Sequence, residues 1–295
     1  MKQKILITGS TGFIGTYIIN LLLKKNIEIY DILRNKNKKN KKIKELKKNK
    51  NYLPIFYKTF NELEKKLKKI KVNTIINCAT YYTSQNSIRN IEKLVKTNII
   101  FCSIILEILK NKIKKFINFG SMMEYSKGNY FSPKNFYAIT KYFFQKIEQF
   151  YKLKYKNIKF YDLKLYETYG DKDSRNKFIP TLIKNYKQNK EIKVISKNLK
   201  MNFVYIESLM KIINMIIFNK IKEGEYCVKN NRFIEIRKLI NSLNIKLEKK
   251  IKIKYLSSKV DFIVTNKLKK FPNWNDKQNL ENFLLKKLQN SYEKL

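Results

Sequence analysis

A tyrosine and a lysine stand four residues apart, at Tyr137 and Lys141, in a stretch whose apolar pattern predicts a helix over Tyr137 to Tyr155. Residues four apart share one face of a helix, so the two side chains are expected to be neighbours. A nearby ammonium group favours the phenolate and lowers the pKa of a tyrosine from about 10 towards neutral pH. Such a phenol can give a proton to, or take one from, a carbonyl or alcohol oxygen.

A serine completes a possible reaction site. Ser121 follows the predicted strand Phe116 to Phe119, and ligands of open α/β sheets bind at the carboxyl ends of the strands. Its hydroxyl is therefore placed to hydrogen-bond the same substrate oxygen as Tyr137. Each feature alone has an ordinary explanation, because a chain with 20 tyrosines and 65 basic residues contains many such pairs by chance, and a serine after a strand is often a turn residue.

Three of the seven glycines, Gly9, Gly12 and Gly15, fall within seven positions. They lie between a predicted strand, Lys4 to Thr8, and a predicted helix, Thr16 to Lys25. Glycine permits a tight turn and lets the backbone approach a diphosphate, whose charge meets the positive end of the helix. The segment therefore predicts a nucleotide phosphate cradle.

The elements that would position these residues alternate between strand and helix. The alternation predicts an α/β fold with a Rossmann-type, doubly wound parallel sheet. Beyond Gly170 the pattern becomes mixed, which predicts a smaller mixed α/β substrate region at 171–295, partly interleaved with a cofactor domain at 1–170. The other predicted strands are Glu28 to Leu33, Tyr52 to Phe56, Thr74 to Ala79, Lys159 to Leu165, Ile192 to Ile195 and Tyr226 to Lys229, and the other helices are Phe60 to Ile70, Ile91 to Lys110, Ile179 to Asn189, Ile206 to Phe218 and Ile234 to Leu243.

The formal net charge of +42 comes mostly from lysines spread along the chain. Residues with A/T-rich codons are abundant, so compositional drift explains the charge, and no nucleic-acid-binding module is recognisable. We expect no specific nucleic-acid partner, although a binding role for the charge stays an alternative. The positive electrostatic potential of such a chain would also favour a dianionic substrate such as a nucleotide diphosphate.

Histidine is absent, which excludes His-based triads and the common zinc sites. The cysteines, Cys78, Cys102 and Cys227, are far apart in apolar surroundings, so we expect reduced thiols and no metal site. The apolar run Ile212 to Phe218 is shorter than the roughly 20 residues that span a bilayer. Because the glycine turn begins at Gly9, no signal peptide is expected either, and these features predict a cytoplasmic protein without a membrane partner.

Taken together, these motifs resemble the extended short-chain dehydrogenase/reductases, in particular the group of NAD(P)-dependent nucleotide-sugar epimerases, dehydratases and ketoreductases. The resemblance is densest over residues 1–210. It implies that Ser121, Tyr137 and Lys141 are catalytic, and that Asn98 supports the lysine through water. The resemblance implies cofactor contacts from Gly9, Thr11, Gly12, Phe13, Ile14, Gly15, Arg34, Ala79, Tyr137 and Lys141.

Within the group, residues 75–210 look most like bacterial 4-ketoreductases of deoxysugar nucleotides. The resemblance implies substrate contacts from Tyr81 and Ser121. Arg175 and Lys177 are candidate phosphate clamps, with plain surface charge as the equal alternative. The dehydratases carry Asp-Glu where Met122 and Met123 stand, so a dehydratase is excluded.

The cofactor depends on the end of the second strand. NAD-specific members of the family have an aspartate there, and the matching position is Leu33, followed by Arg34. Arg34 and Lys36 are placed to pair with a 2′-phosphate, which favours NADPH. Asp31, two residues earlier, leaves NAD open.

We therefore predict the reduction of a keto group, at C4, on a nucleotide-diphosphate sugar, with Tyr137 as the proton donor. The first alternative is a C4 epimerase that retains NAD, since it would use the same residues. A more distant alternative is a nonenzymatic nucleotide- or RNA-binding protein of the same fold. The resemblance also implies a homodimer formed through two helices of each subunit.

Overall fold

The computed structural model describes residues 3–126, 130–218, 220–257 and 268–289. Its centre is a seven-stranded sheet in the order β11-β6-β5-β4-β1-β2-β3, in which every pair is parallel. The predicted doubly wound α/β fold is confirmed. The strands are β1 (Lys4–Thr8), β2 (Glu28–Arg34), β3 (Tyr52–Tyr57), β4 (Thr74–Asn77), β5 (Lys115–Ser121), β6 (Lys159–Leu165) and β11 (Gly224–Val228).

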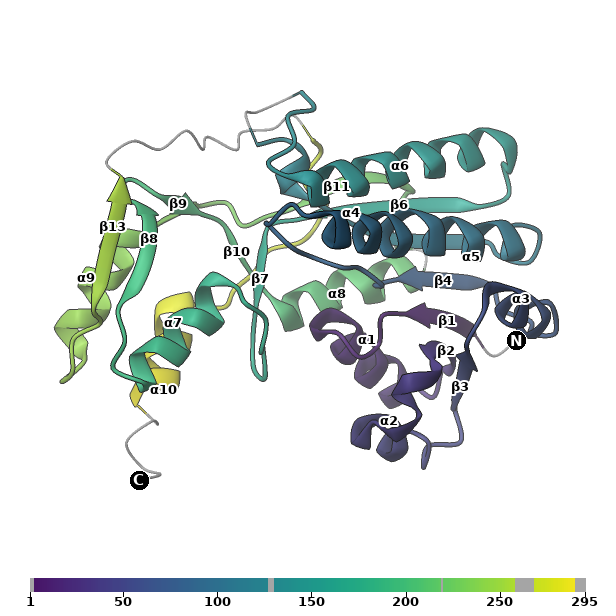
Figure 1. Ribbon diagram of the computed structural model, residues 1–295, viewed down its shortest axis with the longest axis horizontal. Helices are drawn as coiled ribbons and strands as arrows, with labels where there is room; N and C mark the ends of the chain where they lie inside the picture. The colour runs from purple at the N-terminus through teal and green to yellow at the C-terminus, as the bar shows by residue number, and fades with distance from the viewer. Residues whose placement is uncertain (1–2, 127–129, 219, 258–267, 290–295) are drawn as a thin grey trace.

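Helices cover both faces of this sheet (Figure 1). Successive residues of β1 point to opposite faces, so Ile5 and Ile7 join one hydrophobic cluster while Leu6 joins the other. The first cluster includes the inner faces of α1 and α8, and the second those of α3, α5 and α6. The helix bounds are α1 (Phe13–Lys24), α3 (Phe60–Lys68), α5 (Cys102–Leu109), α6 (Phe136–Lys154) and α8 (Ile206–Ile217).

The strand order reverses between β1 and β4, because the chain runs outward from β1 to β3 on one side and from β4 to β11 on the other. Ligands of such sheets bind in the crevice at the carboxyl ends of the two strands beside this reversal. The glycine turn follows β1, and Cys78 and Ala79 follow β4. The fold thus brings the predicted phosphate turn to the reversal point.

The predicted helix over Ile91 to Lys110 is interrupted. The structure has α4 (Ile88–Val95), a π-helical segment η2 (Lys96–Phe101) and then α5. Wider π turns are rare and are frequently found at functional sites. Here the wide turn carries Asn98, whose buried side chain is described below.

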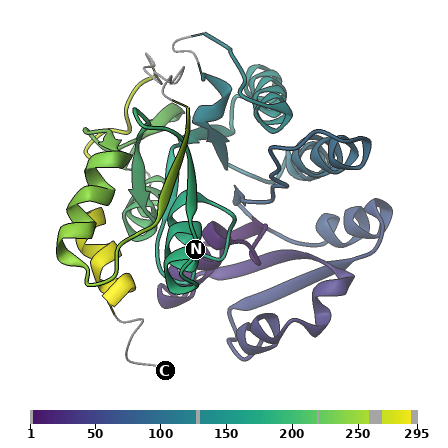
Figure 2. The same cartoon turned by 60° about the vertical axis from the view of Figure 1, so that its left-hand side comes forward.

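Among the described residues, the part of the chain from β7 onward also forms three small two-stranded sheets and has its own hydrophobic cluster. Figure 2 shows α9 and α10 together on the side of the molecule away from the purple N-terminal strands. Within residues 206–228 the chain returns to the main sheet, where α8 packs against one face and β11 forms an edge strand. The boundary between the two domains at residue 170 stays a prediction. The remaining elements are η1 (Asn35–Lys39), α2 (Lys41–Leu46), η3 (Met122–Glu124), β7 (Glu167–Tyr169), α7 (Phe178–Lys187), β8 (Ile192–Ser196), β9 (Lys200–Met201), β10 (Phe203–Tyr205), β12 (Ile234–Glu235), α9 (Ile236–Lys246), β13 (Ile253–Ser257) and α10 (Leu280–Gln289).

All three cysteines are free thiols, as expected. In the part of the chain that the structure describes, no helix combines the length and the apolar character needed to cross a membrane.

Candidate active site

The glycine turn is held close to the strand next to it. Gly9 has a φ of +71°, and a Cβ there would lie 2.5 Å from the backbone nitrogen of Ala79. A Cβ on Gly15 would overlap the carbonyl oxygen of Gly9. At Gly12, the N-cap of α1, the nearest atom to a Cβ would be that same oxygen, at 3.2 Å. Glycine is therefore required at Gly9 and Gly15 for the turn itself, and less so at Gly12.

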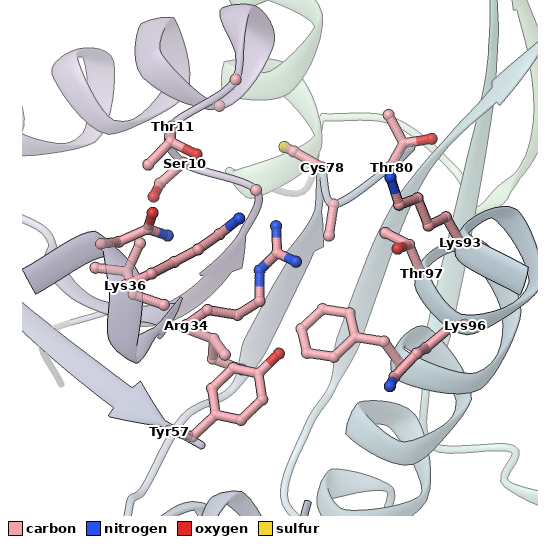
Figure 3. A pocket seen from close by; sticks show the side chains of 18 of the residues that line it. Ser10, Thr11, Arg34, Lys36, Tyr57, Cys78, Thr80, Lys93, Lys96 and Thr97 are labelled. Carbon is pink, nitrogen blue, oxygen red and sulfur yellow. The ribbon is translucent and has the colours of Figure 1, made fainter. Parts of the chain in front are cut away.

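A cavity of about 1140 Å³ opens beside this turn. Figure 3 shows Arg34 and Lys36 directed into it from one wall, opposite Lys93 and Thr97. Drug-sized ligands fill pockets of about 300–1,000 Å³, so this space suits a larger, extended ligand. All the residues predicted to contact the cofactor line it, except Tyr137 and Lys141.

Asp31 does not line this cavity. Its side chain is fully buried inside β2, and Oδ2 accepts a hydrogen bond of 2.5 Å from the hydroxyl of Tyr52. Burial raises the pKa of Asp31 to about 7, although Tyr52 and the charge of Lys42 oppose the shift. Asp31 is thus a buried partner of Tyr52 behind the turn, and it is not placed to bind ribose hydroxyls in the cavity.

Ser121 and Tyr137 come from neighbouring elements. Ser121 is the last residue of β5 and is 8% exposed. Tyr137 lies in the first turn of α6, which begins after Asn135 because the Asn135 side chain accepts a hydrogen bond from the backbone N–H of Ala138 at 3.0 Å. The ring of Tyr137 meets the ring of Tyr82 edge to face, with their centroids 4.9 Å apart.

The pKa of Tyr137 is higher than the sequence predicts. Burial raises it to about 12, and the charge of Lys177 and a hydrogen bond with Thr80 offset only part of this effect. Lys141 is 3% exposed, and its charge acts on the thiols of Cys78 and Cys102. The predicted lowering of the Tyr137 pKa by Lys141 is therefore wrong for this structure.

Asn98 connects the segment after β4 to the start of α6. Its Oδ1 accepts a hydrogen bond from the backbone N–H of Tyr81 at 2.8 Å. Its Nδ2 donates to Thr140 Oγ1 at 3.0 Å, and that hydroxyl donates to the carbonyl of Tyr137 at 2.7 Å. Thr140 precedes Lys141, so Asn98 braces the turn that carries both catalytic candidates. Thr140 was not among the predicted site residues, although its place inside the Tyr-x-x-x-Lys motif was a usable signal.

Two tyrosines after β4 have different roles. The hydroxyl of Tyr81, a predicted substrate residue, donates to Asn90 Oδ1 on α4 at 2.9 Å. The ring of Tyr82 lies against Tyr137 instead. The structure therefore places Tyr82, which was not among the predicted site residues, beside Tyr137.

Lys177 also lies beside this cluster. It is the residue before α7, and its Nζ is 3.3 Å from Glu167 Oε2 and 4.4 Å from the centroid of the Tyr82 ring. The structure thus places Lys177 near Tyr137, and it adds Glu167 as a partner that the sequence did not indicate.

Arg175 lies elsewhere. Its Nε and Nη2 donate to the two carboxylate oxygens of Asp173 at 2.8 and 2.7 Å. Its guanidinium stacks 4.2 Å above the ring of Phe13, in the wall of the large cavity. The predicted pair of phosphate clamps is therefore divided, with Arg175 at the glycine turn and Lys177 at the tyrosine cluster.

Comparisons with known proteins agree with one another on the kind of protein that this chain resembles. The model of the NAD dependent epimerase/dehydratase family matches residues 5–228. A CDP-abequose synthase from Yersinia pseudotuberculosis is 30% identical over 226 residues, covering 76% of each chain. Another from Salmonella muenchen is 25% identical over 259 residues, covering 86% of this chain and 84% of the relative.

Solved structures of the same fold are available. The UDP-glucuronic acid 4-epimerase from Bacillus cereus, in complex with UDP-glucuronic acid and NAD, superimposes with a TM-score of 0.82 at 20% identity over 99% of both chains. The UDP-glucose 4-epimerase from Thermotoga maritima, with UDP-glucose, gives a TM-score of 0.76 at 19% identity over 97% of this chain and 98% of that one. At these identities the likeness supports the fold.

Proposed function

Because the chain belongs to the NAD-dependent epimerase/dehydratase family, we propose that it reduces a keto group, at C4, on a nucleotide-linked deoxysugar. The enzyme class follows from the family, whereas the reductive direction is our inference. The relatives named as CDP-abequose synthases support a deoxysugar nucleotide as substrate. The distant alternative of a nonenzymatic binding protein is excluded by the family.

The partly buried phenol of Tyr137 suits the proposed role of proton donor. With a pKa raised to about 12 by burial, the phenol keeps its proton at neutral pH. A protonated donor suits the reduction of a ketone, because the carbonyl oxygen gains negative charge and needs a proton. An epimerase uses the same phenol twice, taking a proton from an alcohol and returning one to the keto intermediate, so the phenol serves either reaction. The observation that favours the reductase over the C4 epimerase is the likeness to the CDP-abequose synthases.

The chain's own residues divide the remaining work. Ser121 donates a hydrogen bond to the substrate oxygen, and Tyr137 delivers the proton to it. Asn98 and Thr140 keep the catalytic turn in place. The described residues give the buried ammonium of Lys141 no hydrogen bond or ion pair, so it is available to a ligand hydroxyl. A bound nicotinamide dinucleotide supplies the hydride.

The chain's residues fit such a dinucleotide. The turn from Gly9 to Gly15 lines the cavity at the N-terminus of α1, where a diphosphate would meet backbone N–H groups and the positive end of the helix. We further propose that the preferred form is NADPH, because Arg34 and Lys36 enter the cavity (Figure 3) while Asp31 is turned away from it.

Replacing Arg34 by serine tests this preference. We expect the dissociation constant of NADPH to rise about tenfold to 100-fold, the range of a charge-assisted phosphate contact, with little change for NADH. The measurement is titration of protein fluorescence with each cofactor. Arg89→Ser, at an arginine of α4 outside the cavity, is the matched control. Equal weakening of both cofactors would contradict the assignment.

The reaction itself is tested with nucleotide-linked 4-keto-6-deoxysugars that differ in their nucleotide. We expect stoichiometric oxidation of NADPH with at least one of them, followed by loss of absorbance of the reduced cofactor. Tightly bound NAD in the purified protein, together with interconversion of two nucleotide sugars without net oxidation, would instead identify an epimerase.

We propose that the protein forms a homodimer. α6 exposes Phe143, Phe150 and Leu153 at 53%, 56% and 71%, and the neighbouring α4 and η2 expose Ile91 and Ile100. Figure 1 shows α6 running beside α4. We propose that the exposed apolar side chains of these two helices meet the same helices of a second copy. Two such faces would bury each other in a dimer.

The double substitution Phe143→Glu with Phe150→Glu is expected to convert a dimer into a folded monomer, because it places four charges in the shared face. Light scattering after size exclusion measures the mass. Ile245→Glu, at an equally apolar residue of α9 that is 83% exposed, should leave the dimer intact. A monomeric wild-type protein would refute the proposed face.

A further inference from the structure

A buried ion pair lies directly behind Ser121. Lys164 of β6 is fully buried, and its Nζ is 2.5 Å from Glu124 Oε2 and 2.8 Å from Asp162 Oδ2. Glu124 is also fully buried. Pairing between β5 and β6 sets Gly120 opposite Lys164 and Ser121 opposite Leu165, which brings the ammonium group to the end of β5.

Gly120 makes room for this lysine. A Cβ at that position would lie 2.5 Å from Lys164 Cδ and 2.9 Å from Lys164 Nζ. The backbone of Gly120 has no positive φ to explain the glycine. A side chain at position 120 would therefore displace Lys164, and glycine leaves room for it next to Ser121.

Glu124 uses its second oxygen to hold Ser121. Oε1 accepts a hydrogen bond of 2.7 Å from the backbone N–H of Ser121, while Ser121 Oγ accepts one of 3.2 Å from the N–H of Met123. This reciprocal capping box fixes the backbone and the hydroxyl of the serine together. Among the described residues, the Ser121 hydroxyl accepts this bond and donates none, so its proton stays available to a ligand oxygen.

The ion pair anchors that arrangement. Burial alone would lower the pKa of Lys164, but the charges of Asp162 and Glu124 outweigh it and hold the pKa well above its usual range. Burial raises the pKa of Glu124 to about 7, and the charge of Lys164 opposes that shift. Because Glu124 is held at both oxygens, turning away from Ser121 would break a buried hydrogen bond and the contact with Lys164.

We infer that Glu124 and Lys164 are positioning residues for catalysis, because the buried pair fixes the Ser121 hydroxyl in the orientation that receives the substrate oxygen. The inference rests on the proposed function, in which Ser121 contacts that oxygen. Neither Glu124 nor Lys164 reaches the substrate in this account. They act through Ser121, and a double-mutant cycle measures that dependence directly.

The cycle compares Glu124→Ala, Ser121→Ala and the double variant. Ser121→Ala is expected to lower kcat about 100-fold, as for the loss of one donor to a developing oxyanion. Glu124→Ala is expected to lower kcat at least about tenfold, the effect of a misplaced group, with an unchanged KM. In the Ser121→Ala background, Glu124→Ala should cause no further loss, because the hydroxyl that it positions is already gone.

Stability and cofactor binding separate positioning from damage to the fold. We expect each folded variant to bind NADPH as the wild type does, measured by fluorescence titration. Lys115→Met is the matched control, since Lys115 is a buried lysine at the other end of β5 whose Nζ donates to the carbonyls of Ile216 and Ile217. It should lower the melting temperature without lowering kcat. If Glu124→Ala does not fold, Glu124→Asp keeps the charge for Lys164 but is too short to hold both partners.

The outcomes are distinct. The positioning role alone would be overturned if the losses of kcat multiply in the double variant. It would also be overturned if kcat is unchanged in Glu124→Ala or Glu124→Asp while Ser121→Ala is impaired. An unchanged kcat in Ser121→Ala would instead overturn the proposed function of the serine. A loss confined to the Glu124 variants that disappears when Ser121 is alanine would support the inference.

Discussion

Replacing Tyr137 by phenylalanine is expected to lower kcat by about 10²–10⁴-fold, the usual contribution of a positioned general acid. The substitution removes one oxygen and keeps the ring that packs edge to face on Tyr82. The fold and the large cavity should therefore be preserved, and the dissociation constant of NADPH should hardly change. Single-turnover kinetics with a 4-keto nucleotide sugar would separate the chemical step from binding.

The pH dependence follows from the same phenol. Burial raises the pKa of Tyr137 to about 12, so the donor is protonated at neutral pH and loses its proton only at high pH. Reduction should therefore be constant across neutral pH and fall at the alkaline limit, and the reverse oxidation should speed up there. Tyr142→Phe, on the same helix with its ring stacked on Phe131, is the matched control and should keep full activity. Undiminished turnover in Tyr137→Phe would refute the assignment of the proton donor.

Replacing Gly9 by alanine is expected to destabilise the protein by about 2–4 kcal/mol and to abolish cofactor binding, because overpacking and a left-handed backbone add their costs. A Cβ there would lie 2.5 Å from the backbone of Cys78 and Ala79, on a residue whose φ is +71°. Backbone atoms of two adjacent parallel strands cannot move apart without disturbing the sheet. Chemical denaturation of the protein without added cofactor measures the loss.

Gly12→Ala is the matched control within the same turn. Its Cβ would come no closer than 3.2 Å to the carbonyl oxygen of Gly9, at an ordinary φ of −80°. The unfolding free energy should therefore change little. Equal destabilisation by the two substitutions would show that the close approach of β1 to β4 is not what requires glycine at Gly9.

The sequence predicts the main sheet well because its strands are apolar runs with clear boundaries. β1 and β6 have the predicted bounds, Lys4 to Thr8 and Lys159 to Leu165. The short strands of the C-terminal region were mostly missed, because pairs of two or three residues such as β9 and β12 have no periodicity of their own and depend on tertiary packing.

The residues of the candidate site could be predicted from motifs, but the contacts between their side chains could not. The sequence does not distinguish Tyr81 from its neighbour Tyr82. In the structure Tyr81 hydrogen-bonds Asn90, whereas the ring of Tyr82 packs against Tyr137. The buried pair of Glu124 and Lys164 gave no signal, because one buried lysine among so many cannot be recognised before the strands are paired. The pKa of Tyr137 was misjudged because a motif shows its charged neighbours but not its burial.

The central claim is that hydride passes from an exogenous reduced cofactor to the sugar. It is tested most directly by incubating the enzyme with a 4-keto-6-deoxysugar nucleotide and NADPH that carries deuterium at the transferable position of its nicotinamide ring. Mass spectrometry and NMR of the product should find one deuterium, bonded to C4 of the sugar, for each NADPH oxidised. A product without deuterium, formed while the NADPH remains unoxidised, would contradict the account and point to an epimerase with its own retained NAD.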